Sequence, residues 1–236
     1  MFKVNILIFI VMMFSIFQTV KAQTCGFGCL GLSGFFAGYS IQKNSFDNFN
    51  TNLQDKNIKF DNLSGFRFGA NLFRANFDRF IVSFKGYYQI SGQKKVIQEN
   101  VGGALSEDKY ELDLNHWGIG LDFGIPLFGF LDLKIIEGGV DFFSSSYSYK
   151  QTINGFDISD LKFTGSSTDM GYYVGTGLIF HLIKNYASLE GLVYYNKVKV
   201  SYMMNNSGEY LFGKKSGLID SGGFAATIQL NIGVPL

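Results

Sequence analysis

Residues 117–130 read WGIGLDFGIPLFGF, and this stretch decides the fold class. Each odd position from 117 to 127 carries a large apolar residue, whereas the even positions from 118 to 124 are glycine, except for Asp122. Successive side chains of a β-strand point to opposite faces of the sheet. A period of two therefore predicts a strand that has its bulk on one face and a nearly bare second face.

The same alternation recurs through the chain after residue 23, and no segment there carries a helical stripe. The expected fold class is therefore all-β. The predicted strands cover residues 32–42, 64–74, 79–91, 109–125, 131–149, 166–182, 186–202 and 217–234.

The connections between these eight strands alternate in length. The second, fourth and sixth are tight turns with the sequences ANFD, PLFGF and IKN, and Pro126 marks the exit into one of them. This alternation is typical of an up-and-down barrel in an outer membrane, with both chain ends at the short-turn rim. The long, polar connections are expected to face the outside of the cell and cover residues 43–63, 92–108, 150–165 and 203–216.

Side-chain size decides which face of the sheet points inward. In the strand at 217–234, one face carries Phe224 and Ile228, whereas the other carries Gly223 and Gln229. The lumen of an eight-stranded barrel is just filled by one set of ordinary side chains, so the bulky face does not fit inside. We therefore predict an eight-stranded antiparallel up-and-down transmembrane β-barrel, with its bulk toward lipid.

The N-terminus has the features of a secretory signal peptide. Lys3 precedes an apolar run at 5–17, and VKA at 20–22 supplies small-residue cleavage chemistry. The run is too short for a membrane-spanning helix, which needs about 20 apolar residues. We predict cleavage near Ala22. The expected regions are the signal peptide 1–22, a short periplasmic segment 23–31 and the barrel 32–236.

The charge balance argues against one class of partner. The chain has 20 Lys and Arg against 19 Asp and Glu. Loss of Lys3 and Lys21 with the signal peptide leaves 18 cations against 19 carboxylates. A nearly neutral chain gives no electrostatic case for nucleic-acid binding.

Cys25 and Cys29 are the only cysteines, just after the predicted cleavage point. In an oxidising compartment they are a candidate disulfide, structural or incidental, although so short a loop adds little stability through chain entropy. A lipidated Cys25 is the alternative, although the AQT sequence before it makes a poor lipobox. Neither histidine is near in sequence, so no metal site is predicted, and no cofactor is expected.

Alternate positions of each predicted strand point into the lumen, and several of these inward positions carry cations or carboxylates. To keep both Lys134 and Glu137 inside, their strand needs a one-residue slip at Ile135-Ile136, which we interpret as a β-bulge. Unpaired charges there would cost several kcal/mol, so a salt-bridged plug is expected, with a narrow polar pore or proton path as the alternative. The inward set is Arg67, Arg79, Lys85, Asp122, Lys134, Glu137, Asp141 and Glu190, together with Asn71 and Gln229.

Two histidines are the only candidates for a catalytic base. His116 lies on the inward parity near the long-loop rim, but no nucleophile motif accompanies it. His181 lies beside a tight turn and is interpreted as a rim residue. No catalytic residue is therefore predicted, and the chain is expected not to be an enzyme.

Aromatic residues suggest two further roles. Those near strand ends are candidates for interfacial girdles. Those in the long loops, where binding function would reside, serve either adhesive contacts or loop packing. The girdle candidates are Tyr39, Trp117, Tyr172, Tyr186 and Tyr195, and the loop aromatics are Phe46, Phe49, Phe156 and Tyr210.

The signal peptide, eight alternating strands, inward glycines and alternating loop lengths resemble the small outer-membrane β-barrel families of the OmpA-transmembrane, OmpX and opacity types. The richness in Phe, Tyr, Asn and Lys looks like a Bacteroidetes-type member with an "outer membrane protein β-barrel domain". The resemblance covers residues 32–236 and implies a Gram-negative outer membrane. Family members end with an aromatic residue, whereas this chain ends IGVPL at 232–236.

The leading functional hypothesis is an integral outer-membrane barrel with a structural, adhesive or accessory role and no open pore. Its expected partners are outer-membrane lipid and lipopolysaccharide, and an extracellular ligand or envelope protein at the four long loops. The alternatives are a small channel, a barrel subunit of a secretion or assembly complex and, remotely, a lipid-modifying outer-membrane enzyme.

Overall fold

The computed structural model describes residues 30–53, 58–77, 79–166, 169–183 and 186–233. The predicted signal peptide, its cleavage site and both cysteines lie outside the described residues. The elements in chain order are β1 (Leu30–Asn44), α2 (Asp47–Asn50), β2 (Asn62–Asn76), β3 (Ile81–Val101), β4 (Ala104–Phe128), β5 (Leu131–Ile153), β6 (Phe156–Gly165), β7 (Asp169–Ile183), β8 (Ala187–Val200), β9 (Met203–Met204), η2 (Leu211–Gly213) and β10 (Ile219–Gly233).

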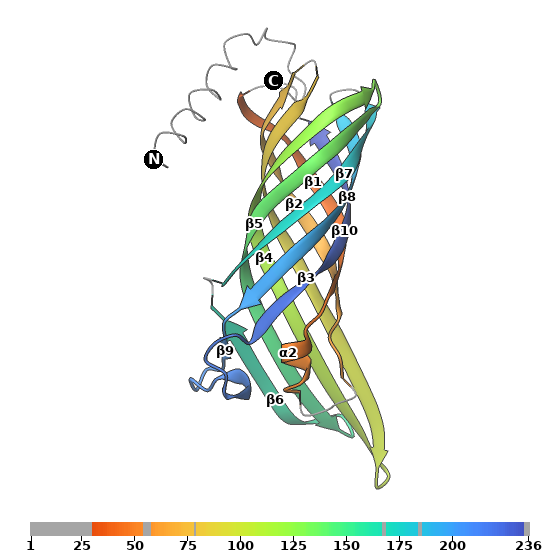
Figure 1. Ribbon diagram of the computed structural model, residues 1–236. Coiled ribbons are helices and arrows are strands. Elements are labelled where there is room, and N and C mark those ends of the chain that lie inside the picture. The colour runs from red at the N-terminus through yellow and green to blue at the C-terminus, as the bar shows by residue number, and fades with distance from the viewer. Residues whose placement is uncertain (1–29, 54–57, 78, 167–168, 184–185, 234–236) are drawn as a thin grey trace, which may run out of the picture.

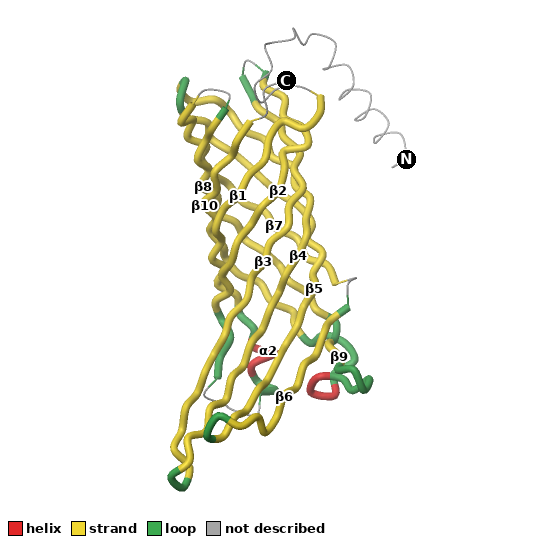
Figure 2. Tube along the Cα trace, turned by 180° about the vertical axis from the view of Figure 1, so that it is seen from behind, coloured by secondary structure: helices red, strands yellow, loops and turns green. Residues whose placement is uncertain are grey.

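Eight of these strands form a closed antiparallel ring, seen from opposite sides in Figures 1 and 2. The strands β1 to β5 pair in succession, β5 pairs with β7, and β7, β8 and β10 follow. Pairing of β10 with β1 closes the ring. The predicted eight-stranded up-and-down barrel is confirmed, and every predicted strand corresponds to one strand of the ring.

Two of the four predicted loops, 92–108 and 150–165, are wrong, because most of their residues lie in β-strands. Beyond the Ser64–Gly92 pair, β3, β4 and β5 continue past the ring and β6 adds to β5, which creates a projecting sheet of residues 93–113 and 145–165. Figure 1 shows it extending downward from the barrel. Two-residue turns at 102–103 and 154–155 have positive φ, as tight hairpins require.

The outer wall of the ring is apolar. Trp117 is 52% exposed and Leu121 is 59% exposed, whereas Asp122, the next residue of β4, is buried inside the ring. A soluble protein rarely exposes such a continuous apolar surface, but a bilayer requires it. All five candidate girdle residues are exposed, namely Tyr39, Trp117, Tyr172, Tyr186 and Tyr195.

Helices have a minor part in this architecture. Among the described residues, no helix has the length and the apolar character that a membrane crossing requires. The helix α2 is a single turn of four residues in the connection between β1 and β2.

Bulges set which side chains enter the lumen. The register shifts between Lys134 and Glu137, where the sequence predicts a bulge, and both side chains are buried inside. A second, unpredicted shift lies between Asn71 and Phe73 in β2, with Leu72 exposed on the outer wall. One extra residue reverses the parity of everything after it.

The long-loop mouth of the barrel is covered by an apolar core, which we call the cap. Segments around α2 and η2 pack onto the long-loop ends of β4, β5, β8 and β10. Phe46 and Phe49 are buried in it, so they serve loop packing, whereas Phe156 is 75% exposed on the projecting sheet. The buried members of the cap are Phe46, Phe49, Leu53, Ile58, Phe60, Leu63, Leu112, Leu114, Phe143, Tyr147, Val198, Val200, Met203, Leu211, Leu218 and Ile219.

Candidate functional site

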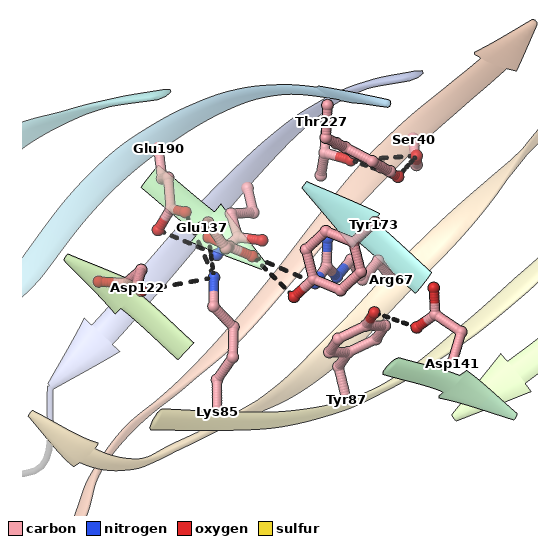
Figure 3. A network of polar contacts seen from close by, with 12 residues as sticks. Ser40, Arg67, Lys85, Tyr87, Asp122, Glu137, Asp141, Tyr173, Glu190 and Thr227 are labelled. Carbon is pink, nitrogen blue, oxygen red and sulfur yellow. Dashed lines mark hydrogen bonds and ion pairs between the residues drawn. The ribbon is translucent and has the colours of Figure 1, made fainter. Parts of the chain in front are cut away.

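The lumen contains a network of buried ion pairs, shown in Figure 3. Lys134 Nζ lies 2.6 Å from Glu137 Oε2 and 3.2 Å from Asp122 Oδ2, and it also pairs with Glu190. Lys85 Nζ lies 2.7 Å from the same Glu137 oxygen and 3.6 Å from Glu190 Oε1. These five predicted lumen residues come from β3, β4, β5 and β8, and the ring brings them together.

A second layer contains Arg67 between tyrosine rings. The guanidinium carbon of Arg67 lies 3.7 Å from the ring centroid of Tyr87, and Nη2 lies 3.7 Å from Glu137 Oε1. The Tyr173 hydroxyl donates to that same oxygen at 3.0 Å, and the Tyr87 hydroxyl donates to Asp141. Arg67 is therefore held by a cation–π contact and an ion pair at once.

The tyrosine layer is absent from the sequence prediction, although the inward glycines signal it. A Cβ added at Gly118 would overlap Asp141 and Tyr87, and a Cβ added at Gly120 would overlap the Tyr173 hydroxyl. The bare face of residues 117–125 is therefore the space that these large inward rings occupy. Glycine at such positions indicates a bulky neighbour rather than an empty lumen.

One predicted lumen residue is wrong. Arg79 is exposed in the turn between β2 and β3, whereas Arg74 is buried in its place. Arg79 lies outside the ring because β3 begins at Ile81 rather than at the predicted residue 79. The bulge at Leu72 reverses the parity of the rest of β2 and turns Arg74 inward. Asp132 Oδ2 accepts from Arg74 Nη2 at 3.2 Å and pairs with His181 Nε2 at 2.7 Å, near the short-turn rim.

His116 is buried inside the ring, next to the cap residues Leu114 and Phe143. Its ring packs 4.9 Å from Phe143 and 6.0 Å from Tyr87, and Nδ1 lies 3.4 Å from the carbonyl oxygen of Leu114. Among the described residues, no three His, Cys, Asp or Glu side chains are grouped as metal ligands. The position of His116 is that of a packed core residue.

A pocket of about 300 Å³ lies where the projecting sheet meets the cap, and we call it the sheet pocket. The inner face of β4, β5 and β6 forms one side of it, and the 203–218 loop and Leu53 form the other. The opposite face of the sheet carries charges, including the ion pair of Lys150 with Asp157 at 2.8 Å. The residues that line the sheet pocket are Leu53, Tyr110, Tyr147, Tyr149, Leu161, Phe163, Leu211 and Phe212.

The closed ring, the apolar outer wall and the charged lumen define the class of this protein as a small transmembrane β-barrel of the outer-membrane type. No family model matches the chain, and no curated protein matches it.

Solved structures with a similar arrangement of strands are outer-membrane proteins of low identity. Ail, the attachment invasion locus protein of Yersinia pestis, in complex with sucrose octasulfate, is 11% identical, with a TM-score of 0.44 over 87% of this chain and 100% of that chain. The outer-membrane protease OmpT from Escherichia coli is 9% identical, with a TM-score of 0.44 over 86% and 95%. Neisserial surface protein A is 13% identical, with a TM-score of 0.37 over 83% and 95%.

Proposed function

We propose that this protein is a non-conducting outer-membrane barrel that binds an extracellular ligand or envelope protein through its projecting sheet and cap. The observation that carries the proposal is the filled lumen. Ion pairs around Glu137 and the Arg67–tyrosine layer block the ring, and the cap covers its mouth. With the lumen closed, the extracellular surface is the only large functional surface that the described residues offer.

The filled lumen predicts that the protein does not conduct. Purified, refolded protein in a planar lipid bilayer is expected to give no unitary current steps above the lipid baseline, because large buried side chains occupy the lumen. A porin added to the same bilayer checks that the preparation can conduct. Steady unitary steps from the wild-type chain would overturn the proposal and favour the channel alternative.

We also propose that lipopolysaccharide surrounds the barrel at the long-loop end. Lys43 of β1 and Lys199 of β8 are exposed there, on the outer parity of strands that carry Tyr39 and Tyr195. Exposed lysines beside an apolar wall suit anionic lipid headgroups, whose phosphates attract cations at close range.

The chain is proposed to reach the outer membrane as a precursor that is cleaved after Ala22. Intact mass and N-terminal peptide analysis of protein extracted from outer membranes are expected to give Gln23 as the first residue, because the 20–22 sequence supplies the small-residue cleavage signal. A mature chain that begins at a lipid-modified Cys25 would contradict this prediction and support the lipoprotein alternative.

A further inference from the structure

The sheet pocket is lined by Tyr147, whose side chain is almost fully buried. Tyr147 is 5% exposed and its ring packs 5.5 Å from Phe49 and 6.3 Å from Phe212, measured between centroids. The hydroxyl of the neighbouring Tyr149 donates to Asp108 Oδ1 at 2.8 Å. Burial raises the pKa of the Tyr147 hydroxyl, so it remains a proton donor at neutral pH.

The walls of the sheet pocket disfavour a charged ligand. Its lining is made of leucine, phenylalanine and tyrosine side chains. An ion placed there would lose its hydration without gaining a counter-ion. A sugar ring would bring several hydroxyls to a surface where the Tyr149 hydroxyl is already committed to Asp108, and each hydroxyl left without a partner costs free energy.

One wall of the sheet pocket is held in a strained conformation. Phe212 has φ of 54°, in the left-handed region that is unfavourable for a non-glycine residue. Its ring packs edge-to-face against Phe49 of the cap, at a centroid distance of 5.5 Å. Strain of this kind concentrates at ligand clamps, where the surrounding packing maintains it.

We propose that the sheet pocket binds a small, uncharged, mainly apolar ring compound that carries one oxygen, and that the Tyr147 hydroxyl hydrogen-bonds to that oxygen. The volume of about 300 Å³ corresponds to the lower end of small-molecule sites, which suits a free monocyclic compound. This inference rests on the proposed function, in which the extracellular surface is the functional part of the barrel.

The test uses the full chain in lipid nanodiscs, with 4-fluorophenol as the probe in ¹⁹F NMR titrations. The variant Leu161→Trp places a large side chain in the pocket. Its titration signal is subtracted from that of the wild type, which removes the contribution of probe that partitions into the lipid. Saturable binding is expected in the wild type and at least tenfold weaker binding in Leu161→Trp. The matched control is Lys162→Trp, on the opposite face of β6, which is expected to bind like the wild type.

Tyr147→Phe separates the hydroxyl from the shape of the pocket. Loss of one hydrogen bond is expected to weaken 4-fluorophenol binding about fivefold. Binding of fluorobenzene, which has no oxygen, is expected to stay unchanged. Heat-dependent gel mobility confirms that each variant is folded.

Three results would overturn the inference: no saturable difference between the wild type and Leu161→Trp, equal 4-fluorophenol affinity in Tyr147→Phe, or tighter binding of 4-fluorobenzoate or methyl β-glucoside. Bilayer recordings keep this failure separate from failure of the proposed function. If the bilayers show no current and the probe does not bind, the sheet pocket is not a ligand site, whereas the proposal of a non-conducting barrel is still supported.

Discussion

Glu137→Gln is expected to lower the free energy of unfolding by about 3–5 kcal/mol, because it leaves buried cations without their shared counter-charge. Glu137 is 0% exposed and lies within 2.7 Å of Lys85 and of Lys134, and it also accepts from Tyr173 and pairs with Arg67. The glutamine keeps the size of the side chain but removes its charge. The effect is therefore electrostatic rather than a cavity effect.

The measurement is urea unfolding of the lipid- or detergent-embedded protein, followed by the fluorescence of Trp117, the single tryptophan. The matched control is Asp157→Asn, which removes a carboxylate from an ion pair on the exposed face of the projecting sheet. Little change is expected there, because water screens exposed pairs. If Glu137→Gln unfolds at the same urea concentration as the control, the lumen network is not a main source of stability.

Phe49→Ala is expected to destabilise the cap by about 3–5 kcal/mol while the ring stays intact. Phe49 is 0% exposed and makes edge-to-face contacts with Phe60, Tyr147 and Phe212, at centroid distances of 5.8, 5.5 and 5.5 Å. Its removal leaves a cavity where several loop segments meet. The open fraction of the cap is then expected to rise by about two to four powers of ten.

The opening is measured by adding protease to intact cells, because the rate of cleavage within residues 43–63 follows the population of the open cap. The control variant is Phe156→Ala, which removes an exposed ring from the tip of the projecting sheet and is expected to leave cleavage at 43–63 unchanged. Equal cleavage rates in the two variants would show that the loops do not depend on a packed cap.

Much of the barrel could be predicted from local patterns. The alternation in 117–130 gives both the strand and its two faces, and the size of the lumen then decides that Trp117 points outward and Asp122 inward. The bulge at Ile135-Ile136 was also predictable, because only a slip in register keeps Lys134 and Glu137 on the same side of one strand.

The failures have three physical causes. Arg74 is missing from the predicted lumen because a single extra residue at Leu72 reverses parity, and no local pattern marks that residue. Arg79 does not enter the lumen because β3 begins only at Ile81, two residues after it. The polar character of residues 92–108 and 150–165 predicts loops, whereas most of these residues form strands. The Gly102–Gly103 turn between β3 and β4 and the Asn154–Gly155 turn between β5 and β6 are the local signals of these hairpins.

The sequence by itself determined the class of the protein, the order of its strands and most of the charges in the lumen. These depend on side-chain period and size, which are local properties. The tertiary structure alone decided which charges meet, such as Lys134 of β5 with Glu190 of β8, and that Tyr147 and Phe212 meet at one pocket. Such contacts join residues far apart in the chain, and closure of the ring and folding of the loops over its mouth set their geometry.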